Sequence, residues 1–429
     1  INQYQLPSLQ ESLRQLHYPT VHADLHQLQD QVSPAKLRLV LEELIAHQLT
    51  LKRAKQQNQR LPAPTLALSK HLEQGLIKNL PFELTGAQQR VWQEVAMDLT
   101  TPVPMVRMVQ GDVGSGKTVL AALAACRAVD HGCQVAVLAP TEILAEQHFH
   151  TFSHWLEPLG INVVWLTGKQ KAQVKRQSLV AIASGEGQVI VGTHALFQEA
   201  VEYQHLGLII IDEQHRFGVA QRHSLVKKAP LGRGLHQLVM TATPIPRTLA
   251  MSVYGDLDHS LIDELPPGRK PINSVLLNNI KRAEVIERIH LACNSGQQVY
   301  WICPLIEASE VLQCEAAQDT AALLTQQLNN IKVGLVHGRL SGTEKAEVMA
   351  QFKAGDIQLL VATTVVEVGV DVPNANLMVI DNAERLGLAQ LHQLRGRVGR
   401  GQVQSHCLFM YQAPLSAMGR ERLDILRQS

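Results

Sequence analysis

The sequence has almost no net charge and few aromatic residues. Its 39 Lys and Arg residues nearly balance its 38 Asp and Glu residues, which leaves a formal net charge of +1. Without a global basic field, a nucleic-acid partner would have to be bound by local patches. Aromatic residues make up only 4% of the chain. This disfavours a protein that grips single strands by stacking bases on aromatic rings.

Cysteines and long apolar runs are also scarce. The 6 cysteines form no CxxC pair and no zinc-like spacing with histidine, which favours buried thiols in a reducing compartment over a metal site. The longest apolar runs, such as residues 206–211, are too short to span a bilayer. No signal peptide is recognisable. The chain starts with Ile1 and ends like a helix cut in mid-course, so we expect a fragment of a longer protein.

Periodicity divides the chain into a helical segment and two α/β domains. Residues 9–17 and 34–60 have apolar residues at helical spacing, with Ser33 as the expected N-cap and Pro34 in the first turn. Residues 61–69 read as a linker. From about Leu80, buried apolar strands alternate with amphipathic helices, as in parallel sheets covered on both faces. We expect a helical segment at 1–62 and α/β domains at 63–262 and 263–429, joined by the proline-rich stretch 263–273.

Residues 111–118 match the phosphate-binding loop pattern GxxxxGK[ST], after a predicted strand and before a predicted helix. The glycines let backbone N–H groups surround a phosphate, and the helix N-terminus attracts the anion. Lys117 is predicted to reach the β- and γ-phosphates of ATP, and Thr118 to offer its hydroxyl to Mg²⁺. The other loop residues predicted to bind the nucleotide are Gly111, Asp112, Val113, Gly114, Ser115 and Gly116.

Two carboxylates follow the buried strand at residues 206–211. In phosphate-loop NTPases an acid at the end of a second strand holds Mg²⁺, and Asp212 is predicted to be this residue. Glu213 is predicted to accept a proton from the attacking water. Gln214 and His215 lie outside this metal chemistry. We expect His215 to sense the γ-phosphate or to relay its state to another domain.

Further motifs accompany this DExH tetrapeptide, in a fixed order. They are LTGAQQR, APTEILAEQH, TATPIPRTLA, LVATTVVEVGVDVPNA and QLHQLRGRVGRG, at residues 84–90, 139–148, 241–250, 360–375 and 390–401. With these segments the chain resembles the superfamily 2 helicases and, within them, the RecG family of branch-migrating DNA helicases, from about Leu80 to Tyr411. The resemblance implies two tandem RecA-like P-loop domains with parallel sheets, preceded by a short α-helical segment. It also implies ATP hydrolysis coupled to DNA unwinding or translocation.

The resemblance assigns roles to more residues. Gln88 is expected to read adenine, and Gly369 and Asp371 to contact the nucleotide from the second domain. Arg397 and Arg400 are expected to be arginine fingers, worth about 10³–10⁵ in rate, and Gln393 belongs to the same catalytic motif. The segment expected to couple hydrolysis to movement is Thr241, Ala242 and Thr243. The residues expected to contact DNA are Pro140, Thr141, Glu142, Thr193, His194, Thr363 and Thr364.

The implied activity is remodelling of branched DNA in recombination and repair, by replication-fork reversal and Holliday junction branch migration. The implied protein is a cytoplasmic, nucleoid-associated bacterial monomer with single-stranded-DNA-binding protein as a partner. The main alternative is a duplex DNA translocase of the transcription-repair coupling type, followed by an RNA-dependent ATPase. An inactive DNA-binding scaffold and a P-loop kinase or transporter ATPase fit the residues less well. The family's wedge domain and translocation hairpin lie outside this chain, so we expect it to bind ATP and to remodel forks poorly.

Overall fold

The computed structural model describes most of the chain. The described residues are 6–19, 33–68, 71–214, 217, 228, 232–242, 257–264, 270–304, 310–363, 372, 374–399 and 403–428. The chain divides into two compact units, one made of residues 1–62 and 245–258 and the other of residues 63–244 and 259–429. Apart from residues 245–258, both predicted α/β domains lie in the second unit, and we call them the first and second lobe.

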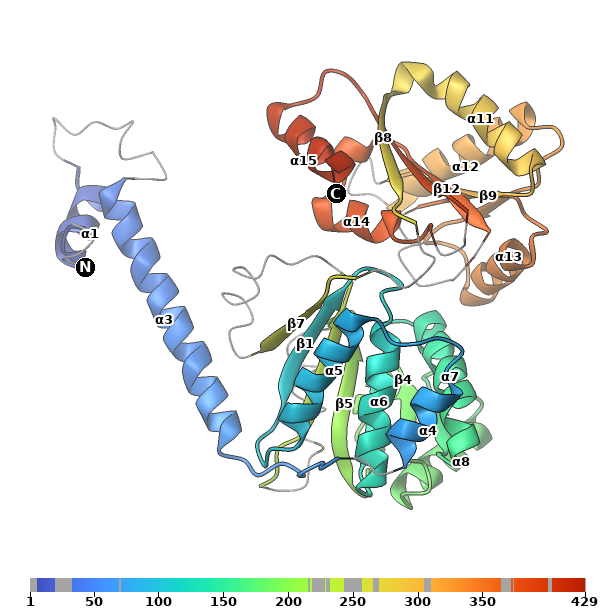
Figure 1. Ribbon diagram of the computed structural model, residues 1–429. Coiled ribbons are helices and arrows are strands. Elements are labelled where there is room, and N and C mark those ends of the chain that lie inside the picture. The colour runs from blue at the N-terminus through green and yellow to red at the C-terminus, as the bar shows by residue number, and fades with distance from the viewer. Residues whose placement is uncertain are drawn as a thin grey trace. The chain divides into compact units, whose positions relative to one another are not determined.

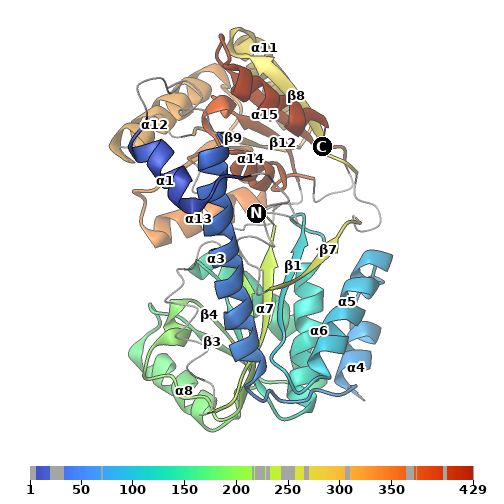
Figure 2. The same ribbon diagram turned by 90° about the vertical axis from the view of Figure 1, so that its left-hand side faces the viewer.

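The first unit contains two helices that pack on each other, α1 (Leu9–His17) and α3 (Pro34–Gln59). Ser8 caps α1 in a capping box, because its hydroxyl accepts from Glu11 N while Glu11 Oε2 accepts from Ser8 N at 2.9 Å. At the start of α3, Ser33 Oγ accepts from Lys36 N at 3.4 Å. The expected cap of this helix is therefore confirmed. Figures 1 and 2 show α3 as one long helix without a break.

The first lobe contains a seven-stranded sheet in the order β3-β4-β2-β5-β6-β1-β7. Strands β1 to β6 pair in parallel. The side chains of β2 and β4 are buried throughout, because helices cover both faces of the sheet. The strands are β1 (Val106–Gly111), β2 (Gln134–Leu138), β3 (Val163–Leu166), β4 (Val189–Gly192), β5 (Leu206–Asp212), β6 (His236–Thr241) and β7 (Asp258–Ile262).

Two apolar layers hold this sheet. Four helices lie on one face (Figure 1), namely α4 (Leu72–Asn79), α5 (Gly86–Leu99), α6 (Lys117–Asp130) and α7 (Glu142–Leu156). Their apolar side chains pack in one core with those of the strands. On the other face, α8 (Ala172–Ala183) and the 3₁₀ turn η3 (His194–Phe197) contribute to a second core. A further 3₁₀ turn, η2 (Glu157–Leu159), follows α7. Helix α6 starts at the phosphate loop and is buried along most of its length, which fixes the loop to the centre of the lobe.

The second lobe has a six-stranded parallel sheet in the order β10-β11-β9-β12-β13-β8. The strands are β8 (Asn273–Asn278), β9 (Gln298–Ile302), β10 (Val333–Val336), β11 (Leu359–Ala362), β12 (Ala375–Ile380) and β13 (His406–Tyr411). Helices α11 (Arg282–Asn294) and α12 (Glu310–Gln327) cover one face. Helices α13 (Gly342–Ala354), α14 (Leu388–Arg395) and α15 (Ala417–Gln428) cover the other. The 3₁₀ turns are η5 (Asn279–Lys281) and η7 (Ala383–Arg385).

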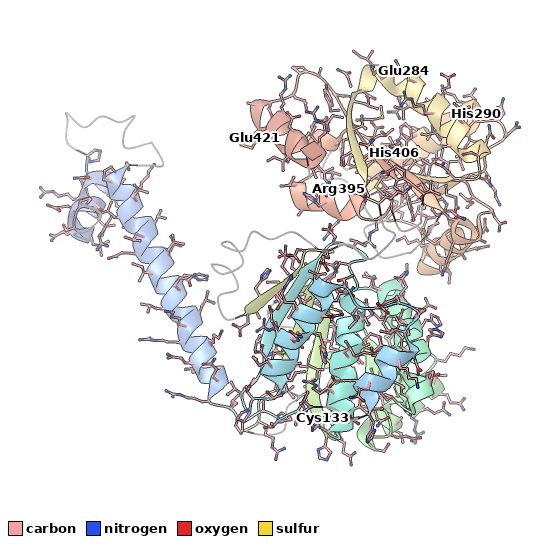
Figure 3. All side chains as sticks on the ribbon, in the orientation of Figure 1. Cys133, Glu284, His290, Arg395, His406 and Glu421 are labelled. Atoms are coloured by element: carbon pink, nitrogen blue, oxygen red, sulfur yellow. The ribbon has the colours of Figure 1, made fainter. Side chains whose placement is uncertain are left out.

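The outer side of α11 shows how these helices divide between core and solvent. Val285 and Ile289 are buried in the core, whereas Glu284 and His290 project outward from the helix (Figure 3). This division follows the helical period of 3.6 residues. Among the described residues, no helix has the length and apolar character that crossing a bilayer requires.

The fold class predicted from the sequence is confirmed: two α/β lobes with parallel sheets follow a helical segment. Three elements were not predicted, namely α4, β7 and β8. The stretch expected to be a linker is bound to the first lobe, because Ala63 N donates to Pro102 O and Leu66 N donates to Leu99 O.

Four of the five cysteines whose side chains are described are buried, and burial raises the pKa of Cys126 to about 12.

Candidate nucleotide and DNA site

The phosphate loop joins the end of β1 to the start of α6. Gly111 is the last residue of β1, and Lys117 is the first residue of α6. Gly114 and Gly116 have φ angles of 79° and 86°, a left-handed conformation that glycine adopts without strain. A Cβ atom at Gly111 would lie 2.5 Å from Ser115 Oγ. The glycine pattern therefore corresponds to real backbone constraints in this loop.

Lys117 folds back onto the loop that precedes it. Its Nζ donates to the carbonyl oxygens of Gly111 at 2.6 Å and Asp112 at 2.8 Å. Burial lowers the pKa of Lys117, although the charges of Asp212 and Glu213 act in the opposite direction. A neighbouring phosphate would favour the charged ammonium in the same way as these carboxylates do. Thr118 follows in the first turn of α6.

Asp212 ends β5 and lies between two hydrogen-bond donors. Its Oδ1 accepts from Glu213 N at 3.1 Å, and its Oδ2 lies 2.8 Å from His148 Nε2. Burial acts to raise the pKa of Asp212, but the hydrogen bond from His148 and the charges of His148 and Lys117 outweigh it, so the pKa is lowered. The carboxylate is therefore held in its ionised form, which a cation ligand requires.

Glu213 has the backbone conformation of a strained position. Its φ is 50°, which is uncommon for a residue with a side chain. The conformation is supported by a hydrogen bond from Glu213 N to Met240 O at 2.9 Å, in the neighbouring strand β6. Strain of this kind concentrates at functional sites. With this φ angle the Glu213 side chain leaves the backbone in a different direction than it would if strand β5 continued regularly.

His148 is the functional neighbour that sequence reasoning missed. It lies on α7, 64 residues before Asp212, and its ring is buried. Nothing in the spacing of the motifs connects the two residues. A signal was present, since His148 is the last residue of the segment APTEILAEQH, one of the motifs that carry the family resemblance.

Gln88 connects the predicted adenine-reading helix to the phosphate loop. Its Nε2 donates to Ser115 O at 2.8 Å, and its Oε1 accepts from Thr85 N at 2.9 Å. A Cβ atom at Gly116 would collide with the Gln88 amide, so glycine is required here for this packing as well as for φ. Each end of the carboxamide keeps one further hydrogen-bonding position, because an amide has two N–H groups and two oxygen lone pairs.

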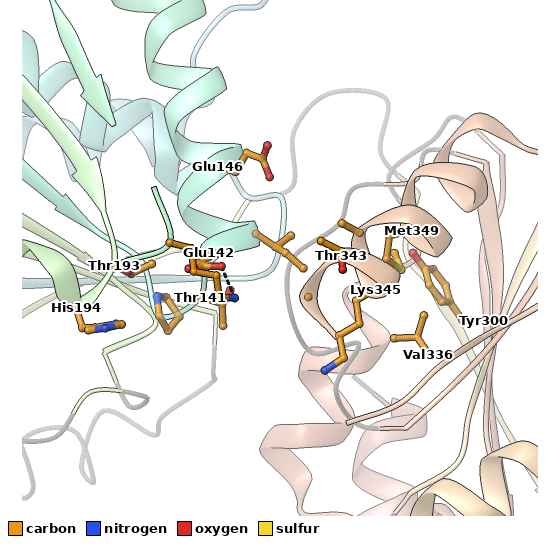
Figure 4. Close-up of a pocket in the computed structure, with 15 residues that line it drawn as sticks. Thr141, Glu142, Glu146, Thr193, His194, Tyr300, Val336, Thr343, Lys345 and Met349 are labelled. Carbon is orange, nitrogen blue, oxygen red and sulfur yellow. Dashed lines mark hydrogen bonds and ion pairs between the residues drawn. The ribbon is translucent and has the colours of Figure 1, made fainter. Parts of the chain in front are cut away.

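The predicted DNA-contacting residues of the first lobe lie at the carboxyl ends of β2 and β4. Thr141 is the N-cap of α7 and accepts from Leu144 N at 3.4 Å. Glu142, labelled in Figure 4, pairs with Lys169 at 2.8 Å. Thr193 is buried and His194 starts η3. Pro140 precedes the cap. The structure thus gathers these residues at one edge of the sheet.

The second lobe places Thr363 in the corresponding position after β11. Thr193 and Thr363 are both buried, and within the described part of the chain neither hydroxyl has a hydrogen-bond partner. Gln393 lies on α14 and Arg397 in the turn that follows it, and both are buried. From this lobe Figure 4 labels residues of β9, β10 and α13: Tyr300, Val336, Thr343, Lys345 and Met349.

The coupling segment begins at the end of β6, where Thr241 and Ala242 are buried. Six predicted site residues lie outside the described residues: His215, Thr243, Thr364, Gly369, Asp371 and Arg400. For them the roles stay predictions.

Comparison with known proteins identifies the two lobes. A family model described as DEAD/DEAH box helicase matches residues 85–252, and one described as helicase conserved C-terminal domain matches residues 281–402. The first match spans the phosphate loop and the DExH tetrapeptide, and the second spans Gln393 and Arg397. The chain belongs to the superfamily 2 helicases.

Several of the similar relatives are RecG proteins. This chain is 56% identical to the ATP-dependent DNA helicase RecG of Escherichia coli K12 over 98% of its length, and 54% identical to RecG of Pasteurella multocida. The chain spans 61% of the length of these relatives. A solved structure of RecG bound to a three-way DNA junction matches with a TM-score of 0.81 and 38% identity, over 99% of this chain and 55% of that one.

A more distant match shows the fold alone. The yeast protein Dbp5 bound to RNA and ADP–BeF₃ has a TM-score of 0.61 and 17% identity, over 85% of this chain and 92% of that chain. The likeness to Dbp5 therefore concerns the fold, whereas the likeness to RecG extends through the sequence.

The residues around Asp212 fit a magnesium ion. Among the described residues no three His, Cys, Asp or Glu side chains form a metal-binding group. Mg²⁺ in NTPases does not need one, because one or two protein oxygens, phosphates and waters complete its octahedron. Asp212 is held ionised, and each of its oxygens uses one hydrogen bond, which leaves lone pairs for a metal-bound water or the ion. Asp212 is thus a suitable ligand, and Thr118, in the first turn of α6, remains the second predicted ligand.

Proposed function

We propose that this chain is the motor core of an ATP-dependent DNA helicase or translocase that remodels branched DNA. The observation that carries the proposal is the arrangement of the phosphate loop, Lys117, Asp212 and Glu213 at one edge of the first sheet. The names of the relatives supply the substrate class, since RecG is described as an ATP-dependent DNA helicase and one solved RecG is bound to a three-way DNA junction.

The proposed mechanism starts with ATP on the first lobe. Backbone N–H groups of the loop and the N-terminus of α6 bind the phosphates, and Lys117 leaves the carbonyls of Gly111 and Asp112 to reach the β- and γ-phosphates. Mg²⁺, held by Thr118 and Asp212, supplies charge neutralisation on the phosphates. Glu213 accepts the proton of the attacking water, and Gln88 contacts adenine with its remaining amide positions.

The second lobe completes the site in this proposal. Arg397 and Arg400 neutralise the charge that develops on the γ-phosphate, which is worth about 10³–10⁵ in rate. ATP therefore favours closure of the lobes, and hydrolysis weakens the closed state. Thr141, Thr193 and Thr363 would contact phosphate and sugar, so sequence preference is expected to be slight. Such a cycle moves the two sets of DNA contacts relative to each other.

The cellular setting follows from the same proposal. Fork reversal and branch migration would place the protein at the bacterial nucleoid in the cytoplasm, acting as a monomer, with single-stranded-DNA-binding protein as a partner. The boundaries 1–62, 63–262 and 263–429 are proposed as those of the helical segment and the two RecA-like domains.

ATP hydrolysis with different nucleic acids tests the proposal. We expect stimulation by a model fork above that by linear duplex or RNA, and loss of turnover in Glu213→Gln with nucleotide binding retained. Equal stimulation by linear duplex and fork would favour a duplex translocase of the transcription-repair coupling type. Stimulation by RNA alone would favour an RNA-dependent ATPase. Unchanged turnover in Glu213→Gln would contradict the assigned chemistry.

A further inference from the structure

His148 contacts the proposed metal ligand directly, although it belongs to no part of the phosphate loop or the acid pair. Its Nε2 lies 2.8 Å from Asp212 Oδ2. An ionised carboxylate can only accept hydrogen bonds, so the imidazole must be the donor. The side chains of His148 and Asp212 are 9% and 14% exposed. Water therefore competes little for this hydrogen bond.

The histidine ring is itself held in place. It makes an edge-to-face contact with Phe152, one helical turn further along α7, at 6.3 Å between ring centroids. Phe152 is fully buried in the core of the first lobe. The ring is thus fixed between the core on one side and Asp212 on the other.

The two oxygens of Asp212 are restrained by different elements. Oδ1 accepts from the backbone of Glu213, whereas Oδ2 is bound by a side chain of α7. One hydrogen bond would leave the carboxylate free to rotate about χ2, which is a soft torsion. The second bond fixes the carboxylate plane and thereby the direction of its remaining lone pairs. Partners of this kind typically change metal affinity or activity by about 10–100-fold when they are removed.

We propose that His148 is a positioning residue, which orients the Asp212 carboxylate for Mg²⁺ and ties it to helix α7. The inference rests on the proposed function, because it takes Asp212 as the metal ligand. The proposed role of His148 is to orient the Asp212 carboxylate, and it does not include contact with the nucleotide. Removing the Nε2 donor should weaken the contribution of Mg²⁺ to nucleotide binding and leave metal-free binding intact.

The experiment measures binding of a fluorescent, non-hydrolysable ATP analogue during a Mg²⁺ titration, and again in EDTA. In His148→Gln the amide nitrogen is as many bonds from Cβ as the ring Nε2 is, so it can keep the contact. In His148→Asn the donor is one bond too short. We expect His148→Asn to raise the Mg²⁺ half-saturation concentration by about 10–100-fold, His148→Gln to stay within a few-fold of the parent chain, and EDTA binding to be equal in all.

The controls separate the alternatives. His150 lies on the same helix with its side chain 72% exposed, so His150→Gln should behave as the parent. His148→Leu, which has no donor at all, replaces His148→Asn if that variant does not fold. A normal Mg²⁺ half-saturation in His148→Asn, or in His148→Leu where it replaces that variant, would overturn the inference, as would an equal loss of binding with and without Mg²⁺. Asp212→Asn is the reference: if it leaves the half-saturation unchanged, the metal assignment of the proposed function fails instead.

Discussion

Arg127 shows at the scale of one residue how a charge can be buried in the first lobe. It lies on α6 with 1% of its surface exposed. Its guanidinium is bound by both carboxylate oxygens of Glu73, with Nη2 to Oε2 at 2.9 Å, and also donates to Ala96 O at 3.0 Å. Its Cζ lies 4.9 Å from the ring centroid of Trp92. One side chain therefore joins α4, α5 and α6.

Breaking this pair should be costly. We expect Glu73→Leu to lower the free energy of unfolding by about 3–5 kcal/mol, because the buried guanidinium is left without its counter-ion. The double variant Glu73→Leu with Arg127→Met should recover most of this loss, since an apolar pair of similar volume removes the uncompensated charge. Urea unfolding followed by tryptophan fluorescence measures both. Additive losses in the double variant would show that the pair is not coupled.

His236 is the second residue with a clear energetic consequence. Its Nδ1 accepts from Met105 N at 3.0 Å, and its Nε2 lies 2.7 Å from Pro64 O. Since the first partner only donates and the second only accepts, the ring is neutral with its proton on Nε2. Burial lowers the pKa of His236, against the opposing effects of Pro64 O and Asp98. The folded state thus binds a second proton, which would have to sit on Nδ1, less readily than the unfolded state does.

Stability should therefore fall with decreasing pH. The contribution of neutral His236 to the free energy of unfolding is fully present above the pKa of the unfolded state, about 6.5. It is lost as the pH falls from there toward the lower pKa of the folded state, by at most about 1.4 kcal/mol per pH unit. Urea midpoints of the parent and of His236→Leu between pH 5 and 7.5 measure this. The variant should be less stable at neutral pH and have a shallower pH dependence. Equal slopes in the two proteins would contradict the assignment.

At the scale of elements, the two sheets repeat one construction. The strand order β3-β4-β2-β5-β6-β1 corresponds to β10-β11-β9-β12-β13-β8. A buried glutamine begins the third strand of each order: Gln134 in β2 and Gln298 in β9. Both donate from Nε2 to two carbonyl oxygens at the end of the neighbouring helix and its following loop. Each glutamine thus ties the start of its strand to the end of a helix and the loop that follows it, at the same place in both lobes.

The two glutamines differ at their oxygens, which gives a prediction. Gln134 Oε1 accepts from Gln204 N and His205 N, at 2.7 and 3.1 Å, whereas Gln298 Oε1 is buried and has no partner among the described residues. Each buried group left unsatisfied costs about 1–3 kcal/mol. Gln134→Leu leaves two backbone donors without their acceptor, whereas Gln298→Leu leaves none at this oxygen. We therefore expect the loss in Gln134→Leu to exceed the loss in Gln298→Leu by at least about 2 kcal/mol. Hydrogen exchange of each lobe measures the two losses, and a larger loss in Gln298→Leu would refute the comparison.

Helix α7 gives a prediction about coupling. It starts at Thr141 and Glu142, the proposed DNA contacts, and reaches His148 about 10 Å further along its axis. If α7 moves as one element, DNA should change the Mg²⁺ half-saturation of nucleotide binding by about 5-fold or more in the parent chain. This effect should vanish in His148→Asn and persist in His148→Gln. A DNA effect of the same size in all three proteins would show that coupling runs elsewhere.

The sequence predicted what depends on local pattern. Continuous apolar strands, the phosphate loop and the N-cap of α3 each depend on residues that are neighbours in the sequence, and these were found as expected. Strand β7 was missed because only two of its five residues are buried, and β8 because it follows a proline-rich stretch. Helix α4 contains Gly75, which weakens a helical pattern. The contact of His148 with Asp212 depends on how α7 packs on the sheet, so no spacing rule could reveal it.

At the scale of the whole molecule, each lobe has its own cores, and the proposed catalytic groups are divided between them. Lys117, Asp212 and Glu213 belong to the first lobe, whereas Gln393 and Arg397 belong to the second. Arg397 follows α14 in a turn closed by a hydrogen bond from its own N to Leu394 O at 2.9 Å. Its backbone is thus fixed to its own lobe. In the proposed mechanism the first lobe therefore holds ATP, and the second lobe supplies Arg397.

Replacing Arg397 should therefore separate binding from turnover. We expect Arg397→Ala to lower kcat by about 10³-fold or more, because a planar guanidinium no longer stabilises the transition state. The dissociation constant of the fluorescent analogue in the presence of Mg²⁺ should change only a few-fold, since the first lobe supplies most of the ground-state contacts. Arg397→Lys keeps the charge but not the forked geometry and should restore only part of the rate. Single-turnover hydrolysis and equilibrium binding measure the two quantities. If Arg397→Ala weakened binding as much as turnover, the residue would act in holding the nucleotide, and the division of labour between the lobes would have to be redrawn.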